Sequence, residues 1–291
     1  MSYANFKPTV FAANYLKDLE DNLIFAPLCS RAHDGEVSKL GQSIVFKSIG
    51  YPTISTPSKK TGLLSAGTIE ELEDTSLIMQ VNQVRTFYFG VGDIDKEESA
   101  EGGGIVAQGR TNAARKMAEE IDDYVAGLVN KKEAQLVNAS GSEPALTKDN
   151  VLLKLDNLIQ KAKEDGISPS DLRVVGTPRF IKLVLQAYRD LDTNNSEMIK
   201  KGFVGRYSDV TLLESNHVKY SGTKNTTSQI DLIPVFTKRA VGYAHPMSKT
   251  EAERPDGTFE DALKGLTLFD AKILYPKEFM VLNVKYDAAA L

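Results

Sequence analysis

Residues 41–95 read GQSIVFKSIGYPTISTPSKKTGLLSAGTIEELEDTSLIMQVNQVRTFYFGVGDID. The first part, 41–49, alternates apolar and polar residues as a β-strand does, and 75–95 forms a second extended run. Between them lies a polar segment that is interrupted by proline and glycine and ends in an acidic run, 70–74. Two β-rich arms joined by a long tip predict a two-stranded ribbon that projects from a folded domain.

The predicted ribbon carries more apolar surface than a free arm normally exposes to water. An isolated two-stranded ribbon is only marginally stable, so we predict that it lies on another subunit. The predicted assembly interface consists of Ile44, Phe46, Ile49, Leu77, Met79, Val81, Phe87 and Phe89 along the arms, with Lys59 and Lys60 at the tip. The two lysines are interpreted as a solvated cationic tip that faces acidic surface on a neighbour.

The composition is that of an ordinary folded protein. The chain has 291 residues, of which 42% are hydrophobic and 25% charged, enough for one large domain or two lobes. Its net charge of −4 argues against tight nucleic-acid binding through a basic surface. The single cysteine, Cys29, excludes an intrachain disulfide framework and is interpreted as a buried apolar residue. We expect neither a secretory leader nor a membrane span, since no apolar run approaches about 20 residues.

The strongest helix signal of the chain covers residues 105–132 and follows the predicted ribbon after a flexible joint at 102–104. Its apolar positions recur at helical spacing and form an inner stripe of Ala113, Met117, Ile121, Val125 and Leu128. At 1.5 Å per residue such a helix is roughly 40 Å long, which makes it a spine of the molecule. A shorter helix is expected near the N-terminus, from Thr9 to about Phe25.

The second half of the chain predicts an α-β-α unit followed by strands. A helix at 151–164 is expected to have Thr147 as its N-cap and Gly166 just past its end. A strand at 171–175 and a helix capped by Thr177 follow. Further strands are expected at 210–213, 230–236, 240–243, 266–274 and 279–284, with an insertion at 245–261 that interrupts them. The fold class is therefore α+β, with the ribbon outside the core.

Motifs for chemistry are weak. The glycine-rich segment 102–110 lacks the GxxxxGK[ST] pattern of a phosphate-binding loop, so a hinge is the better interpretation. The histidines, His33, His217 and His245, are too scattered to indicate a zinc site with a single cysteine. Asp93 and Asp95 do not continue into a calcium-binding loop. We therefore predict a protein that is not an enzyme and has no catalytic, cofactor or metal site.

The order of these segments resembles that of tailed-bacteriophage major capsid proteins with the Hong Kong 97 fold. The extended-loop and spine segments of that family are matched here by Gly41–Val45, Asp74–Val81, Phe87–Asp95 and Ala113–Asp122. DLRVVGTPRFIKLVLQA (171–187) resembles the family's axial domain, and GLTLFDAKILYPKEFMVLNV (265–284) resembles its closing peripheral strands. The likeness covers about residues 8–286 and depends on order and spacing, because no single motif is diagnostic.

The resemblance implies a set of domains. They are an N-terminal arm and helix (1–40), an extended loop (41–95), a spine helix with peripheral domain (96–150), an axial domain (151–262) and closing peripheral strands (263–291). It also implies a shell subunit that forms pentamers and hexamers around double-stranded DNA, without sequence-specific binding, a cofactor or a membrane. Such a protein belongs to the virion and is assembled in the host cytoplasm. Because the chain starts almost directly at the arm, a separate scaffolding protein is expected, together with a portal.

In some relatives, a lysine of the extended loop forms an isopeptide bond with an asparagine of a neighbour. Lys59 and Lys60 stand where such a lysine could lie, but no partner can be located by motif, so a noncovalent shell is expected. Two other functions remain open. One is an encapsulin-like nanocompartment, which would enclose an enzyme cargo in a shell of the same fold. The other is a soluble enzyme that binds a phosphate ligand with the glycines at 102–104.

Overall fold

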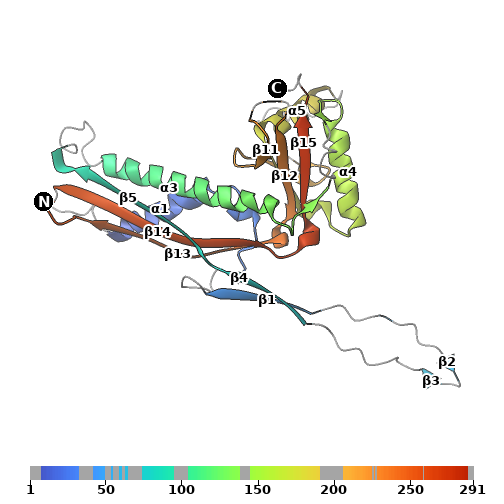
Figure 1. Ribbon diagram of the computed structural model, residues 1–291, viewed down its shortest axis with the longest axis horizontal. Coiled ribbons are helices and arrows are strands. Elements are labelled where there is room, and N and C mark those ends of the chain that lie inside the picture. Colours follow the sequence, from blue (N-terminus) through green and yellow to red (C-terminus); the bar gives the residue numbers. More distant parts are fainter. Residues whose placement is uncertain are drawn as a thin grey trace.

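The structure is a computed structural model of the chain (Figure 1). It describes residues 8–32, 42–49, 54, 59–60, 63–64, 74–94, 104–137, 145–190, 206–224, 226, 228–257 and 259–287. The helices are α1 (Pro8–Asn22), α3 (Gly104–Ala126), α4 (Val151–Glu164) and α5 (Pro178–Asp190), with 3₁₀ turns η2 (Ala26–Leu28), η3 (Gly127–Asn130), η4 (Pro169–Asp171), η5 (Lys238–Ala240) and η6 (Pro276–Glu278). The strands are β1 (Ser43–Ile49), β2 (Lys59–Lys60), β3 (Leu63–Leu64), β4 (Asp74–Gln80), β5 (Gln83–Gly92), β6 (Gln135–Leu136), β7 (Ala145–Leu146), β8 (Leu172–Gly176), β9 (Arg206–Tyr207), β10 (Val210–Glu214), β11 (Tyr220–Ser221), β12 (Ile230–Thr237), β13 (Val241–Glu253), β14 (Glu260–Ile273) and β15 (Phe279–Tyr286).

The long lobe consists of the sheet β13-β14-β5 with α1 and α3 on one face. Figure 1 shows α3 lying lengthwise along these strands. Most of the predicted apolar stripe of α3 is buried: Met117, Ile121 and Val125 are at most 5% exposed, whereas Ala113 is half-buried. The α-helix ends at Ala126, earlier than predicted, because the chain tightens into the 3₁₀ turn η3 at Gly127. At 23 residues the helix is roughly 35 Å long, which agrees with the role of a spine.

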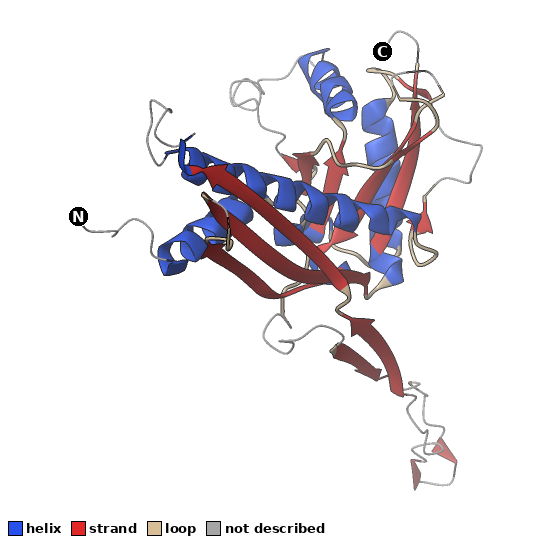
Figure 2. Cartoon of the chain, turned by 60° about the vertical axis from the view of Figure 1, so that its left-hand side comes forward, coloured by secondary structure: helices blue, strands red, loops and turns tan. Residues whose placement is uncertain are grey.

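The compact lobe is built on an eight-stranded sheet. Six of its strands follow the order β6-β15-β12-β8-β10-β9, and the other two, β7 and β11, pair with β15 and β12. One face packs against α4 and α5 through a core that includes Leu155, Phe180 and Val235. The other face shares a core with the long lobe, where Phe236 and Val281 join the end of α3. The two lobes are visible side by side in Figure 2. The predicted α-β-α unit at 151–190 is confirmed as α4, β8 and α5.

Local signals for the helix ends are mostly confirmed. Gly166 has a φ of +77°, as a residue just past a helix end often has. The Thr177 hydroxyl accepts a hydrogen bond from the Phe180 N–H at 3.4 Å, so Thr177 caps α5. The predicted N-cap Thr147 is wrong. Asn150 is the N-cap of α4, and its side chain accepts from the Thr147 N–H at 2.9 Å instead of capping the helix.

Two predictions for the C-terminal strands are wrong. The expected insertion at 245–261 is instead a hairpin of two long strands, β13 and β14, and a register shift between Ala244 and Met247 accommodates Pro246. A domain boundary at 262 would therefore cut β14. The closing strands also separate, because β14 belongs to the long lobe whereas β15 pairs with β12 in the compact lobe.

The chain passes between the lobes after η3, where it runs from α3 into β6, and again at η5 and η6, which contact each other. Glu278 in η6 ties them together: its carboxylate accepts from the Thr237 hydroxyl at 2.5 Å and from Arg239 Nε at 2.8 Å. The backbone N–H of Leu274 also donates to the Ala240 carbonyl at 2.8 Å. These contacts fix the joint between the two sheets.

We expect Glu278→Gln to lower the stability of the protein at neutral pH by about 1–2 kcal/mol, because the amide loses the charge-assisted hydrogen bonds. Burial acts to raise the pKa of Glu278, but the hydrogen bonds from Arg239 and Thr237 outweigh it and hold the pKa below the ordinary 4.5. A depressed folded-state pKa stabilises the protein above the unfolded pKa, and this contribution is lost as the pH falls through the folded pKa. Chemical denaturation at pH 7 and below pH 4 should show a difference that disappears in acid. A difference that is constant across this range would contradict the assignment.

Candidate functional site

The ribbon of this structure consists of β1 and β4, which pair antiparallel and leave the long lobe at its lower side (Figure 1). Its two faces differ. Ile44 and Met79 lie opposite each other and are each 2% exposed, whereas the next pair, Val45 and Ile78, is 45% and 51% exposed. One face of the ribbon therefore packs on the subunit itself, and the other presents apolar side chains to solvent.

The inward face ends in a small core at the base of the ribbon. This root cluster consists of Ile44, Met79, Val81, Ala244 and Leu268, with Phe46 and Val84 packed against it. Ala244 and Leu268 come from β13 and β14, so the ribbon begins on the outer face of the long lobe's sheet, opposite the helices. The root cluster anchors the ribbon in the core of its own subunit.

The prediction that one subunit cannot bury the apolar residues of 41–95 is therefore wrong for part of the set. Ile44, Met79 and Val81 lie in the root cluster. Phe87 and Phe89 belong to β5, which pairs with β14 in the long lobe rather than with β1. These five side chains serve the subunit's own packing.

The aromatic residues of β5 pack against helices. The Phe87 ring centroid lies 5.3 Å from that of Tyr15 in α1 and 6.1 Å from that of Phe89. A Cβ at Gly109 of α3 would lie 2.7 Å from the Phe89 ring, so this glycine is what allows the spine helix to lie so close to β5. β5 thus supports the spine rather than extending the ribbon.

The remaining predicted interface residues have mixed positions. Phe46 and Leu77 are half-buried. The backbone of Lys59 and Lys60 pairs with Leu64 and Leu63 as β2 and β3, but the side chains of both lysines and of Ile49 lie outside the described residues. Their contact with a neighbour stays a prediction.

The outer face of the long lobe continues past the root cluster as an open, largely apolar surface, which we call the outer shelf. It is a depression of about 710 Å³ lined by Thr86, Phe87, Tyr88, Lys249, Glu251, Glu253, Lys264, Gly265 and Leu266. Tyr88 is 60% exposed. Lys264 of β14 forms ion pairs with Glu251 and Glu253 of β13 in the same depression. A large aromatic ring in this position is a common element of protein–protein contacts. The outer shelf was not anticipated from the sequence, where Tyr88 reads as one member of an aromatic strand.

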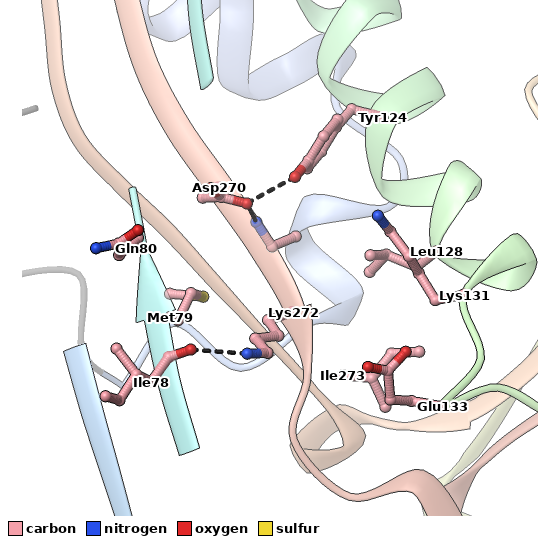
Figure 3. Close-up of a pocket in the computed structure, with 11 residues that line it drawn as sticks. Ile78, Met79, Gln80, Tyr124, Leu128, Lys131, Glu133, Asp270, Lys272 and Ile273 are labelled. Atoms are coloured by element: carbon pink, nitrogen blue, oxygen red, sulfur yellow. Dashed lines mark hydrogen bonds between the residues drawn. The ribbon is translucent and has the colours of Figure 1, made fainter. Parts of the chain in front are cut away.

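A second cavity, of about 530 Å³, lies between the ribbon and the end of α3 (Figure 3). Asp270 of β14 stands in its wall and is 7% exposed. Its carboxylate accepts from the Tyr124 hydroxyl at 2.7 Å, and Lys272 Nζ donates to the Ile78 carbonyl at 2.7 Å. Sequence reasoning missed Asp270. The available signal was that Asp270 follows the apolar Leu266 and Leu268 at a spacing of two residues, which places an acidic residue on the same face of the strand.

A second buried carboxylate, Asp122, joins α3 to the segment after α1. It accepts from the backbone N–H groups of Ile24 at 2.8 Å and Phe25 at 2.9 Å. The next residue, Asp123, is exposed. Asp122 therefore has a structural role, in which it satisfies two backbone donors at the entry to η2.

Cys29 is fully buried next to Asp122, and burial raises the pKa of its thiol to about 12. The thiolate is the reactive form, so we expect the folded protein not to react with a thiol reagent such as DTNB at pH 8. The same protein in denaturant should release one equivalent of chromophore. Rapid labelling of the folded chain would show that Cys29 is accessible.

The described residues contain no cluster of three or more His, Cys, Asp or Glu that could hold a metal ion. Within the same residues, none of the helices is long and apolar enough to cross a membrane. Gly104 is the first residue of α3, whereas Gly102, Gly103, His33 and Asp95 lie outside the described residues. The part of the glycine-rich segment that is described thus belongs to the spine helix.

Known structures resemble this arrangement over nearly the whole chain. A chain from Mycobacterium phage Che8 matches with a TM-score of 0.69 and 18% identity, over 89% of this chain and 90% of the other. The capsid of cyanophage P-SCSP1u matches with a TM-score of 0.66 and 17% identity, over 91% and 89%. The mature capsid of bacteriophage PhiM1 matches with a TM-score of 0.65 and 15% identity, over 92% and 88%. The chain has a bacteriophage capsid fold.

The capsid fold extends beyond these phage structures. The holo-SrpI encapsulin complex from Synechococcus elongatus matches with a TM-score of 0.52 and 13% identity, over 87% of this chain and 86% of the other. In sequence, no protein-family profile and no curated protein matches the chain. At these identities the likeness concerns the fold alone.

Proposed function

We propose that this chain is the major capsid protein of a tailed bacteriophage, a structural subunit that forms the pentamers and hexamers of an icosahedral shell around double-stranded DNA. The observation that carries the proposal is the match to phage capsid chains over about nine-tenths of both partners. The sequence order of arm, ribbon, spine and lobes supports it independently.

In this proposal the fold is of the Hong Kong 97 type. The long lobe is the peripheral domain, with α3 as its spine helix, the compact lobe is the axial domain, and β1 with β4 is the root of the extended loop. A separate scaffolding protein and a portal take part in assembly in the host cytoplasm. The net charge of −4 suits a container, because a strongly basic wall would hold packaged DNA through its phosphates.

The apolar surfaces that the subunit leaves open suggest how copies join. The outward ribbon face, with Val45 and Ile78, is one such surface, and the outer shelf around Tyr88 is another. We propose that the ribbon of one subunit lies over the outer shelf of the next. Such a contact joins two different patches, so it can repeat from subunit to subunit around a ring when the rotation between neighbours closes.

Electron microscopy of the purified protein, alone and co-expressed with its scaffolding protein, tests the proposal. Closed particles tens of nanometres across would support it. A protein that stays monomeric in both preparations and binds a nucleotide in a filter assay would favour the soluble-enzyme alternative instead.

The encapsulin match keeps a nanocompartment as the second candidate. The lower TM-score of that match, 0.52 against 0.69, favours the phage interpretation. Particles isolated from the native source distinguish the two. Nuclease-resistant DNA inside the shell is expected for a capsid, whereas an enzyme cargo without DNA would indicate a nanocompartment.

Assembly is expected to be noncovalent. Denaturing gels of mature particles should show a single band near 31.9 kDa, because no motif in the sequence indicates an isopeptide partner for Lys59 or Lys60. A ladder of multimers that disappears in the variant with both Lys59→Ala and Lys60→Ala would contradict this expectation and would demonstrate cross-linking by the ribbon tip.

A further inference from the structure

The exit of the ribbon from the long lobe is held by two polar contacts from one strand. β14 pairs with β5 up to Phe269, which faces Gln83. Beyond this point β5 has ended, and the Asp270 carboxylate instead accepts from the backbone N–H of Asn82 at 3.2 Å. Two residues later, Lys272 Nζ donates to the Ile78 carbonyl at 2.7 Å. The first contact holds the backbone of Asn82, between β4 and β5, and the second holds the backbone of Ile78 in β4.

Asp270 also contacts the spine helix. Its other carboxylate oxygen accepts from the Tyr124 hydroxyl at 2.7 Å, and the Tyr124 ring meets Phe269 edge-on with centroids 5.6 Å apart. Burial, with the hydrogen bond to Asp270, raises the pKa of Tyr124, so its hydroxyl stays a neutral donor. One buried carboxylate therefore connects the end of α3 with the exit of the ribbon.

The space beside these contacts is open. The cavity of about 530 Å³ separates the β4 end of the ribbon, at Ile78–Gln80, from Leu128 and Lys131 at the end of the spine (Figure 3). Among the described residues of β1 and β4, the fully buried apolar side chains are Ile44 and Met79, both in the root cluster, and Phe46 packs against it. Because the root cluster is small and the cavity lies beside it, we infer that the polar contacts of Asp270 and Lys272 determine the direction of the ribbon.

We propose that Asp270 is a positioning residue that sets the direction in which the ribbon leaves the subunit, with Lys272 as a second hold, and that it couples this direction to the end of the spine helix. The proposal concerns the isolated subunit and goes beyond the shell function. It can therefore fail while the capsid assignment stands, or hold in a protein that forms no shell.

The test measures the ribbon's direction with spin labels. Cysteines replace Val45 on the exposed ribbon face and Lys116 on the exposed side of α3, and the buried Cys29 stays unlabelled. Double electron–electron resonance on isolated subunits gives the distance distribution between the labels. We expect a narrow distribution in this parent protein. Asp270→Ala should broaden it, Lys272→Met should broaden it less, and the double variant should broaden it most.

Two further variants separate positioning from a general loss of packing. Tyr124→Phe keeps the ring and removes only the hydroxyl that holds Asp270, so it should broaden the distribution without unfolding the chain, even if Asp270→Ala does not fold. Lys182→Ala, at an exposed position of α5 in the compact lobe, is the control and should leave the distribution unchanged.

Amide hydrogen exchange supplies a second readout. The Asn82 N–H is held by Asp270, whereas the neighbouring Val81 N–H donates to the Gln42 carbonyl inside the ribbon at 3.1 Å. In Tyr124→Phe and Asp270→Ala, exchange at Asn82 should accelerate while Val81 keeps its protection. Unchanged distance distributions in Tyr124→Phe and Lys272→Met, or equal acceleration at both amides, would overturn the proposal.

Discussion

Ile121→Asp is expected to abolish folding of the subunit. Ile121 is 0% exposed in the C-terminal half of the spine helix, in the core that joins both lobes. An aspartate there would place an unpaired charge among apolar side chains, which costs several kcal/mol. Because the total stability of a domain is about 5–15 kcal/mol, a loss of this size, added to the lost packing, exceeds what the fold can tolerate.

Circular dichroism and solubility after expression measure this effect. Asn112→Asp, which adds the same charge at an exposed position of the same helix, is the matched control and should melt like the unchanged protein. If Ile121→Asp subunits stay soluble with the same melting temperature, the spine assignment is wrong.

Replacement of residues 55–67 by a short Gly-Ser turn is expected to leave a folded subunit that cannot form normal shells. The root cluster and both lobes lie outside the replaced segment, so the core is kept. The tip contains β2 and β3, which lie far from both lobes in Figure 1, where a neighbouring copy would lie. Its loss removes contact area between subunits without a change in the subunit's own packing.

Circular dichroism and electron microscopy of the same preparation decide between the outcomes. A native spectrum with absent or aberrant particles is expected. Normal closed shells would show that the tip is not needed for the contact between subunits, and loss of the native spectrum would show that the tip belongs to the subunit's core.

The elements that the sequence predicts well are those with local signals. The bounds of α4 agree with the prediction because an apolar helical stripe ends at a glycine, Gly166, that can adopt a positive φ. The stripe of the spine helix was equally readable, since Met117 and Ile121 repeat at helical spacing. The extended run predicted at 75–95 contains most of β4 and all of β5, although it was interpreted as one arm.

The sequence did not show which strands pair. β5 was assigned to the ribbon because it follows β4 directly, but it pairs with β14, whose residues lie 168 to 186 positions later in the chain. Periodicity reveals the face of a strand and not its partner, and pairing depends on contacts made only in the folded chain. For the same reason the segment 245–261 was interpreted as an insertion, although a bulge accommodates Pro246 within β13.

The candidate site was predictable only in outline. A ribbon that meets a neighbour was expected from 41–95, but the residues that hold it, Asp270 and Tyr124, lie on elements far away in sequence. An acidic residue within an apolar strand indicates a buried hydrogen-bond network, but the partners in that network are known only from the folded structure. The sequence could not show that Val45 and Ile78 are exposed whereas Ile44 and Met79 are buried, because it does not tell which face of the ribbon packs on the subunit.

An electron cryo-microscopy reconstruction of the assembled particle tests the central claim most directly. We predict an icosahedral shell in which the β1–β4 ribbon of each subunit lies over the outer shelf of its neighbour, next to Tyr88. A particle in which the ribbon contacts only its own subunit, or a protein that forms no shell with its scaffolding protein present, would contradict the account.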